Sequence, residues 1–219
     1  MYLYGASGHA KVIAETLKEN GIEIEGVYDD NTAIQSFCNY PFLGVLNTTS
    51  KQQTFIISIG NNIYRKKIAN NLHVDWGQAI SKYANISDSV LVGCGTVVMK
   101  GVSINVDVKI GTHVILNTNC SIDHDCIIDD FVHIAPGSTL CGNVFVGEGT
   151  LLGAGSVVLP GIKIGKWCII GAGSVVTKDI PDNMIVIGVP AKILRHKELC
   201  EKVLSGGGGE SPYSKQAGE

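Results

Sequence analysis

The sequence predicts a mainly β protein: a C-terminal left-handed parallel β-helix of hexapeptide repeats that follows a small N-terminal α/β, Rossmann-like domain. Three observations carry this prediction. An aliphatic residue recurs at every sixth position from Ile86 to Val176, and a strand–glycine–helix pattern fills the first 80 residues. Glycine is abundant, with 27 residues, while only 6% of the chain is aromatic. A composition rich in glycine and poor in rings favours a repetitive β architecture over an ordinary α/β globule.

The N-terminal part, residues 1–82, reads as alternating strands and helices. We expect strands at 1–4, 22–28 and 54–59. A helical pattern through Lys18 follows the first strand, and a second helix carrying Arg65 follows the third. A strand, a glycine turn, a helix and a further strand are typical of a small parallel sheet.

The β-helix, residues 83–181, is predicted by its period. Three hexads close one triangular coil of 18 residues, with the aliphatic side chain inward on each side and small residues in the corners. Every eighteenth residue should therefore overlie its predecessor, at the ordinary strand spacing of about 4.8 Å. The aliphatic positions are Ile86, Val92, Val98, Ile104, Ile110, Leu116, Ile122, Ile128, Ile134, Leu140, Val146, Leu152, Val158, Ile164, Ile170 and Val176.

The remaining residues form a short C-terminal region and a tail. In 182–204 we expect a strand at 184–192 that leaves the prism, followed by a short helix at 193–204. Residues 205–219 have low complexity, which is typical of a flexible tail.

Composition also restricts the partners. The net charge of −3 gives no reason to expect nucleic acid, and no apolar stretch of 18 residues or N-terminal signal sequence predicts membrane insertion, so we expect a cytoplasmic protein. Seven cysteines without a C-x-x-C pair indicate buried thiols rather than disulfides. His113, His124 and His133 are spaced by 11 and 9, which does not favour a zinc site, so we predict no metal.

His124 is the first candidate for chemistry. It occupies an outward-facing turn position, and the residue one coil later is Gly142. An imidazole beside a bare backbone N–H could be a base next to an oxyanion donor, and Asp125 could fix its tautomer. An exposed histidine taken alone is more often only a solvated surface residue.

His133 faces another side of the prism, near the column Pro136, Ala154 and Ala172. One subunit cannot easily bring His124 and His133 together, whereas two prisms packed side by side can. The spacing thus suggests a cleft between protomers, lined on one wall by small residues against which a thin ligand could lie. Alanine and glycine could equally serve only to form the turns.

A third candidate is the edge of the N-terminal sheet. Strand ends carry a glycine turn, an acidic pair and a further glycine, at the edge where open parallel sheets bind ligands. The helix N-terminus suits a diphosphate, and the carboxylates suit sugar hydroxyls, although caps and turn formers would look the same. The residues are Ser7, Gly8, His9, Asp29, Asp30 and Gly60.

Several segments together resemble a known family. They are Tyr-Gly-Ala-Ser-Gly-His at 4–9, Ile-Gly-Asn-Asn at 59–62, the hexads, Asp-His-Asp-Cys at 123–126, Ala-Gly-Ser-Val-Val-Leu-Pro-Gly at 154–161 and Gly-Val-Pro-Ala-Lys at 188–192. Over about residues 1–195 the chain resembles the hexapeptide-repeat sugar acyltransferases of the sialic acid O-acetyltransferase type. Within them it is most similar to the UDP-4-amino-sugar N-acetyltransferases of bacillosamine synthesis.

The resemblance implies a homotrimeric enzyme that uses acetyl-CoA to acetylate the 4-amino group of a UDP-linked 4-amino-4,6-dideoxy sugar for bacterial glycans. His124 would be the general base, tuned by Asp125, and Gly142 would face the thioester oxygen. Some relatives have Glu where Asp125 stands. His133, Ala154 and Ala172 would contact acetyl-CoA, and the N-terminal residues just named would bind the nucleotide sugar.

Three alternatives stay open at this point. The same base would serve an O-acetyltransferase of a sialic acid-like sugar, and a GDP-linked amino sugar would change only the N-terminal pocket. A non-catalytic β-helix scaffold is the third alternative, and the stacking of His124 on Gly142 argues against it.

Overall fold

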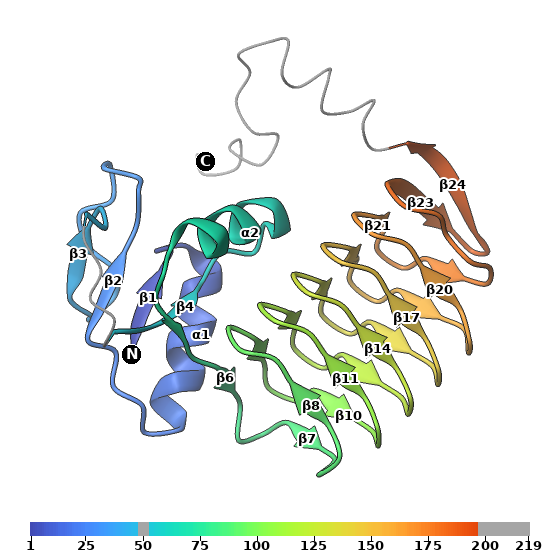
Figure 1. Cartoon of the computed structure of the whole chain (residues 1–219), viewed down its shortest axis with the longest axis horizontal. Helices are drawn as coiled ribbons and strands as arrows, with labels where there is room; N and C mark the ends of the chain where they lie inside the picture. The colour runs from blue at the N-terminus through green and yellow to red at the C-terminus, as the bar shows by residue number, and fades with distance from the viewer. Residues whose placement is uncertain (48–52, 197–219) are drawn as a thin grey trace, which may run out of the picture.

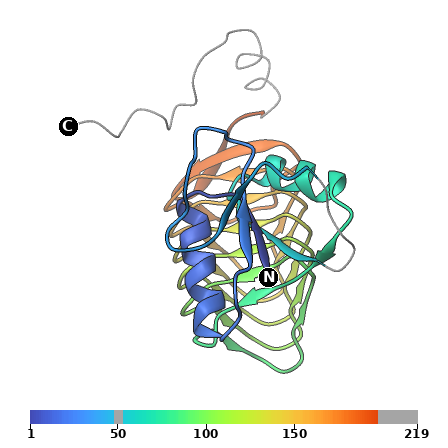
Figure 2. The same ribbon diagram turned by 90° about the vertical axis from the view of Figure 1, so that its left-hand side faces the viewer.

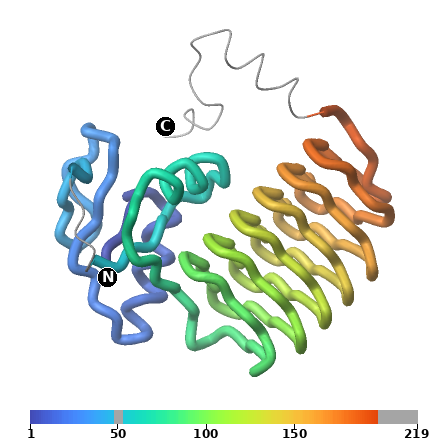
Figure 3. The backbone as a smooth tube through the Cα atoms, in the orientation of Figure 1, coloured from blue at the N-terminus to red at the C-terminus, as the bar shows by residue number. Residues whose placement is uncertain are grey.

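The computed structural model of the protein describes residues 1–47 and 53–196. It has two parts, a small α/β unit and a long β-helix (Figure 1). The α/β unit covers the first coils of the β-helix, and the later coils extend beyond it (Figure 3).

The α/β unit is built on one parallel sheet with the strand order β3-β2-β1-β4-β5. The chain reverses direction across the sheet between β1 and β4, so the loops after these two strands diverge at the point where such sheets bind ligands. The elements are β1 (Tyr2–Tyr4), α1 (Gly8–Glu19), β2 (Gly26–Tyr28), β3 (Phe42–Gly44), β4 (Thr54–Ile57), α2 (Asn62–Asn71) and β5 (Asp75–Trp76). The three expected strands and two helices are confirmed, although β2 and β4 are shorter than expected.

The β-helix is left-handed and has three parallel sheets, one on each side of the prism. The first sheet, here called the docked sheet, runs from β6 to β24; the other two begin with β7 and β8. The strands of the docked sheet are β6 (Ala79–Ile80), β9 (Val97–Val98), β12 (Ile115–Leu116), β15 (His133–Ile134), β18 (Leu151–Leu152), β21 (Ile169–Ile170), β23 (Met184–Gly188) and β24 (Ala191–His196). Those of the second are β7 (Asn85–Ile86), β10 (Ser103–Ile104), β13 (Ser121–Ile122), β16 (Thr139–Leu140), β19 (Val157–Val158) and β22 (Val175–Val176). Those of the third are β8 (Leu91–Val92), β11 (Lys109–Ile110), β14 (Ile127–Ile128), β17 (Phe145–Val146) and β20 (Lys163–Ile164).

The register confirms the predicted period. Strand pairs join residues 18 apart, as in Ser103 with Ser121 and Ser121 with Thr139. The second residue of each two-residue strand points inward, and these aliphatic side chains form one continuous core. Each coil therefore buries its apolar side chains against its neighbours, since a single coil has no interior of its own.

The α/β unit rests on the docked sheet. Apolar residues of α1, among them Ile13 and Leu17, pack against the outward side chains of Val97 and Ile115. Figure 2 looks from the side of the α/β unit and shows the coils stacked behind it. The buried contact fixes the carboxyl edge of the small sheet against the middle of the β-helix.

The C-terminal region differs from expectation. The strand at 184–192 does not leave the prism: β23 continues the docked sheet beside β21, then turns back as β24. The expected helix at 193–204 is wrong for its first four residues, Ile193 to His196, which belong to β24 because they pair with the free edge of β23. Residues 197–204 and the tail at 205–219 lie outside the described residues.

Candidate functional site

His124 stands on the corner between β13 and β14, with 53% of its side chain exposed. Its Nδ1 lies 2.7 Å from Asp125 Oδ2. A carboxylate only accepts hydrogen bonds, so this contact places the proton on Nδ1 and leaves the Nε2 lone pair free. The expected pairing of His124 with Asp125 is confirmed.

The imidazole of His124 lies in a field of negative charge. The hydrogen bond to Asp125, followed by the charge of Asp123, raises the pKa of His124 above its usual value. Asp123 Oδ2 is 4.0 Å from His124 Nε2. The ring is therefore a stronger base than an ordinary surface histidine.

Gly142 is buried beneath this ring, as the period predicted. A Cβ built on Gly142 would lie 2.6 Å from both Cε1 and Nε2 of His124, so any side chain would push the imidazole away. The Gly142 carbonyl accepts a hydrogen bond from Gly161 N at 3.0 Å. Within the described part of the chain, the Gly142 N–H has no partner.

The column of small residues occupies a different corner of the prism. Gly155 N donates to Pro136 O and Gly173 N donates to Ala154 O, each at 2.9 Å, which confirms that Pro136, Ala154 and Ala172 stack coil on coil. All three are exposed. One protomer holds His124 on one corner and this small-residue column on another, with the sheet of β13, β16 and β19 between them.

His133 points from the docked sheet toward the α/β unit. Its Nε2 lies 3.1 Å from Asn117 Nδ2, the backbone of Gly60 contacts its ring, and its ring centroid is 6.3 Å from that of His9. Burial, followed by the charge of Arg65, lowers the pKa of His133 to about 3, so the ring is neutral at physiological pH. The structure thus brings His133 to the N-terminal candidate residues.

The loops after β1 and β4 meet at the switch point of the small sheet. Ser7 is the N-cap of α1, yet its side chain makes no capping hydrogen bond, and the first turn of α1 has no acidic residue. A Cβ on Gly8 or Gly60 would meet nothing within 4 Å, and neither has a positive φ. The fold itself does not require glycine at these two positions, so the open space above them is free for a ligand.

His9 lies at the inner side of this space. Its Nε2 is buried and has no hydrogen-bond partner in residues 1–47 and 53–196. Burial, followed by the Arg65 charge, lowers the pKa of His9 to about 4. A neutral imidazole with an unsatisfied buried nitrogen needs a partner, which a ligand in the open space could supply.

Asp29 and Asp30 serve the loop itself. Asp29 accepts from Ala6 N at 2.7 Å and from Asn31 N at 2.8 Å, so both of its oxygens are occupied. Asp30 Oδ1 accepts from Tyr4 Oη at 2.7 Å. Asp29 therefore holds the glycine turn, and Asp30 keeps only one oxygen for a ligand.

Arg65 is a site residue whose role the sequence did not reveal. Its guanidinium is buried and donates to backbone carbonyls of both parts: His113 O and Phe131 O at 2.8 Å, and Gly60 O at 3.2 Å. Burial lowers the pKa of Arg65 to about 9, and the group stays charged at neutral pH. Arg65 fastens the Gly60 loop to the β-helix, and its only sequence signal was a cation early in the second helix.

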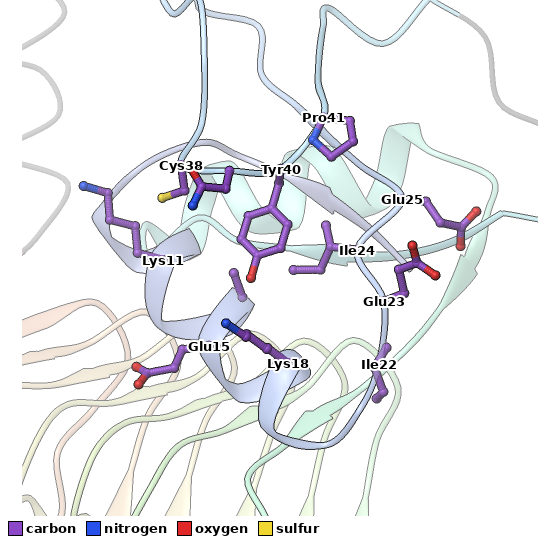
Figure 4. Close-up of a pocket in the computed structure, with 12 residues that line it drawn as sticks. Lys11, Glu15, Lys18, Ile22, Glu23, Ile24, Glu25, Cys38, Tyr40 and Pro41 are labelled. Atoms are coloured by element: carbon purple, nitrogen blue, oxygen red, sulfur yellow. The ribbon is translucent and has the colours of Figure 1, made fainter.

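Another cavity, of about 730 Å³, contains none of the predicted residues. It lies between α1 and the segments before β2 and β3, with Tyr40 facing Lys11 and Lys18 (Figure 4). Among the described residues, no three His, Cys, Asp or Glu side chains are grouped as a metal site would need. No helix in residues 1–47 or 53–196 is long and apolar enough to cross a bilayer.

Comparison with known proteins matches both parts of the chain. Residues 1–72 match the profile of the PglD N-terminal domain, and residues 143–178 match the bacterial transferase hexapeptide (six repeats). An uncharacterized protein of Acanthamoeba polyphaga mimivirus is 40% identical over 96 residues, 42% of this chain and 20% of that protein. The chain thus spans about a fifth of the length of this curated relative.

Solved structures resemble the whole fold. A histidine-to-asparagine variant of perosamine N-acetyltransferase from Caulobacter crescentus, in complex with CoA and GDP-perosamine, is 36% identical over 89% of this chain and 96% of that one, with a TM-score of 0.83. The acetyltransferase domain of PglB from Neisseria gonorrhoeae, in complex with acetyl coenzyme A, is 35% identical over 88% and 98%, with a TM-score of 0.82. WeeI from Acinetobacter baumannii is 29% identical over 88% and 98%, with a TM-score of 0.79.

Proposed function

Because the chain belongs to the hexapeptide-repeat sugar N-acetyltransferases, we propose that it transfers an acetyl group from acetyl-CoA to the amino group of a nucleotide-linked amino sugar. The specific acceptor we propose is the 4-amino group of a UDP-linked 4-amino-4,6-dideoxy sugar. The observation that carries the proposal is the free Nε2 of His124 above the unpartnered N–H of Gly142. A base and an oxyanion donor are what transfer from a thioester requires.

The reaction is a direct transfer. His124 Nε2 takes a proton from the sugar amine as the nitrogen attacks the thioester carbonyl carbon. The Gly142 N–H donates to the oxygen that becomes negative, the C–S bond breaks, and the imidazolium returns a proton to the CoA thiolate. The thioester is already activated, so proximity and a base suffice without a covalent enzyme intermediate.

The nucleotide end of the substrate fits the α/β unit. Uncapped N–H groups at the start of α1 suit a diphosphate, with Ser7 and the buried His9 Nε2 as further partners. The bare backbones of Gly8 and Gly60 would let the ligand approach closely. Asp30 keeps an oxygen for a sugar hydroxyl, whereas Asp29 would act by holding the turn.

Acetyl-CoA is the proposed occupant of a cleft between protomers in a homotrimer. The exposed column of Pro136, Ala154 and Ala172 offers a smooth wall, and a neighbouring protomer would supply His124. Large apolar side chains on the outer corners and faces of the β-helix, such as Leu91 and Val106, are 64% and 51% exposed and would be covered by assembly. The proposed contact of His133 with acetyl-CoA would use the edge of its ring beside Asn117.

A GDP-linked amino sugar is the second candidate acceptor. The relative from Caulobacter crescentus binds GDP-perosamine, and its chain matches this one over 96% of its length. The choice between uridine and guanosine depends on the N-terminal pocket alone, since the base and the cleft would be the same.

Release of free thiol from acetyl-CoA tests the proposal. We expect turnover with UDP- or GDP-linked 4-amino sugars and none with the matching 4-hydroxy sugars. Protection of the protein against heat by UDP or GDP would identify the nucleotide, since a ligand that binds only the folded state raises the melting temperature. No thiol release with any amino sugar would refute the proposed function.

A further inference from the structure

We propose that Asp123 binds the protonated amine of the acceptor sugar beside His124 and thereby selects an amine over a hydroxyl. This inference rests on the proposed function and deepens it, because it assigns acceptor specificity to one carboxylate of the same corner.

Asp123 is held with one oxygen fixed and the other open. Its Oδ1 accepts from Asn105 Nδ2 at 2.7 Å and from the backbone N of His124 at 2.9 Å. Its Oδ2 faces the reactive side of the imidazole, 4.0 Å from Nε2. No hydrogen bond reaches this oxygen from the residues that the structure describes.

The 4.0 Å gap between Oδ2 and Nε2 matches an ammonium group. A nitrogen about 2.8 Å from both atoms fits that separation, and an ammonium has three N–H groups to donate. Asp125 engages Nδ1 on the opposite side of the ring, so it does not compete for this position. The hydrogen bond from Asn105 is the largest cause that lowers the pKa of Asp123, which keeps the carboxylate charged at neutral pH.

Space for the groups around the amine lies next to Asp123. A cavity of about 210 Å³ opens on the outer face of β10, β13 and β16. Its lining is mostly polar and includes Ser103, Asn105, Ser121, Asp123, Thr139 and Cys141.

The chemistry distinguishes the two kinds of acceptor. An amine that arrives protonated gives one proton to His124 Nε2 and becomes a nucleophile. As its nitrogen bonds to the acetyl carbon and the C–S bond breaks, its second proton passes to the CoA thiolate, and His124 later releases the first to solvent. A hydroxyl arrives neutral and has only one proton to lose, so a carboxylate at this position does not attract it.

The test compares Asp123→Asn with wild type by thiol release, using the 4-amino sugar nucleotide that the wild type turns over best. Asparagine keeps the shape and the contacts of Oδ1 but removes the charge. The matched control is Asp88→Asn, an exposed carboxylate in the same corner column two coils before His124, about 10 Å away. kcat and KM are measured from about pH 6.5 to about pH 9.5, a range that spans the titration of an amine near the α-amino value of about 8.

We expect kcat/KM of Asp123→Asn to be at least about tenfold below wild type at the acidic end, mainly through KM, because a charged hydrogen bond is lost. The deficit should shrink toward the alkaline end, where the amine is neutral. Loss of the Asp123 charge also lowers the pKa of His124, which alone would help the variant at low pH. A deficit greatest at low pH therefore reports on the substrate and not on the base.

The outcomes are separable. A deficit equal at all pH values, or no deficit, would overturn the inference while the proposed function stands. A deficit shared by Asp88→Asn would overturn it as well, since general charge would explain it. If wild type releases no thiol with any amino sugar nucleotide, the proposed function fails and takes this inference with it.

Discussion

At the scale of single residues, the account depends on His124. We expect His124→Ala to lower kcat about 100-fold or more, because the variant has no group to remove the amine proton. The Kd of the nucleotide sugar should stay within about threefold, since His124 lies on the β-helix corner, away from the α1 N-terminus. Steady-state thiol release and calorimetry check the two parts, with His73→Ala, an exposed histidine of the α/β unit, as the control.

Gly142 offers a second residue test. A methyl group there would occupy the volume of the imidazole, with contacts of 2.6 Å, while the backbone does not require glycine for its φ. Gly142→Ala should therefore fold normally but displace His124 from its position over the backbone N–H. We expect kcat to fall about 10- to 100-fold with KM for acetyl-CoA little changed. Wild-type kcat in this variant would contradict the placement of His124.

At the scale of elements, Arg65 joins α2 to the corner of the β-helix. Replacing it with alanine leaves carbonyls of His113, Phe131 and Gly60 without their donor. We expect Arg65→Ala to lower the free energy of unfolding by about 3 kcal/mol, as expected for several buried acceptors left unsatisfied. Urea denaturation checks this against Lys67→Ala, an exposed cation on the same helix, which should change stability by less than about 0.5 kcal/mol.

The same contact predicts how stability depends on pH. Burial is the first cause that lowers the pKa of His9 and His113 to about 4 and that of His133 to about 3, below the value of 6.5 for an exposed histidine. Between these values the unfolded chain binds protons that the folded chain does not, so stability is full above about pH 6.5 and falls as the pH drops. Each histidine contributes about 1 kcal/mol per pH unit in this window.

Thermal unfolding between about pH 7 and pH 5 measures this effect. The wild type should lose several degrees in melting temperature, and His133→Asn should lose less because one titrating group is gone. Equal losses in the two proteins would contradict the neutral, buried state of His133.

Much of the fold followed from sequence because the β-helix is repetitive. The position of Ile122 in its hexad determines that Ile104 lies below it and Leu140 above it, and the same arithmetic placed His124 over Gly142. Contacts between parts have no such period. The contacts of Arg65 and His133 with Gly60 depend on how the α/β unit docks, and no spacing within one strand encodes that. The β23–β24 hairpin was missed because pairing at a free sheet edge outweighed a weak helical pattern.

At the scale of the whole molecule, function depends on two different corners of the prism. His124 belongs to one corner, and Ala154 with Ala172 belongs to another. Side-by-side packing of identical prisms would bring unlike corners together and complete a cleft that one protomer lacks. The N-terminal sheet would then present the nucleotide sugar from the docked side.

Subunit complementation tests this central claim most directly. His124→Ala removes the base, and Ala154→Trp fills the small-residue wall, so each variant alone should be nearly inactive. Mixed by co-expression in equal amounts, their trimers should regain about one quarter of the wild-type activity, because about one interface in four pairs an intact His124 with an intact wall. Mixed trimers that form but regain no activity would place the base and the wall in one protomer and contradict the account.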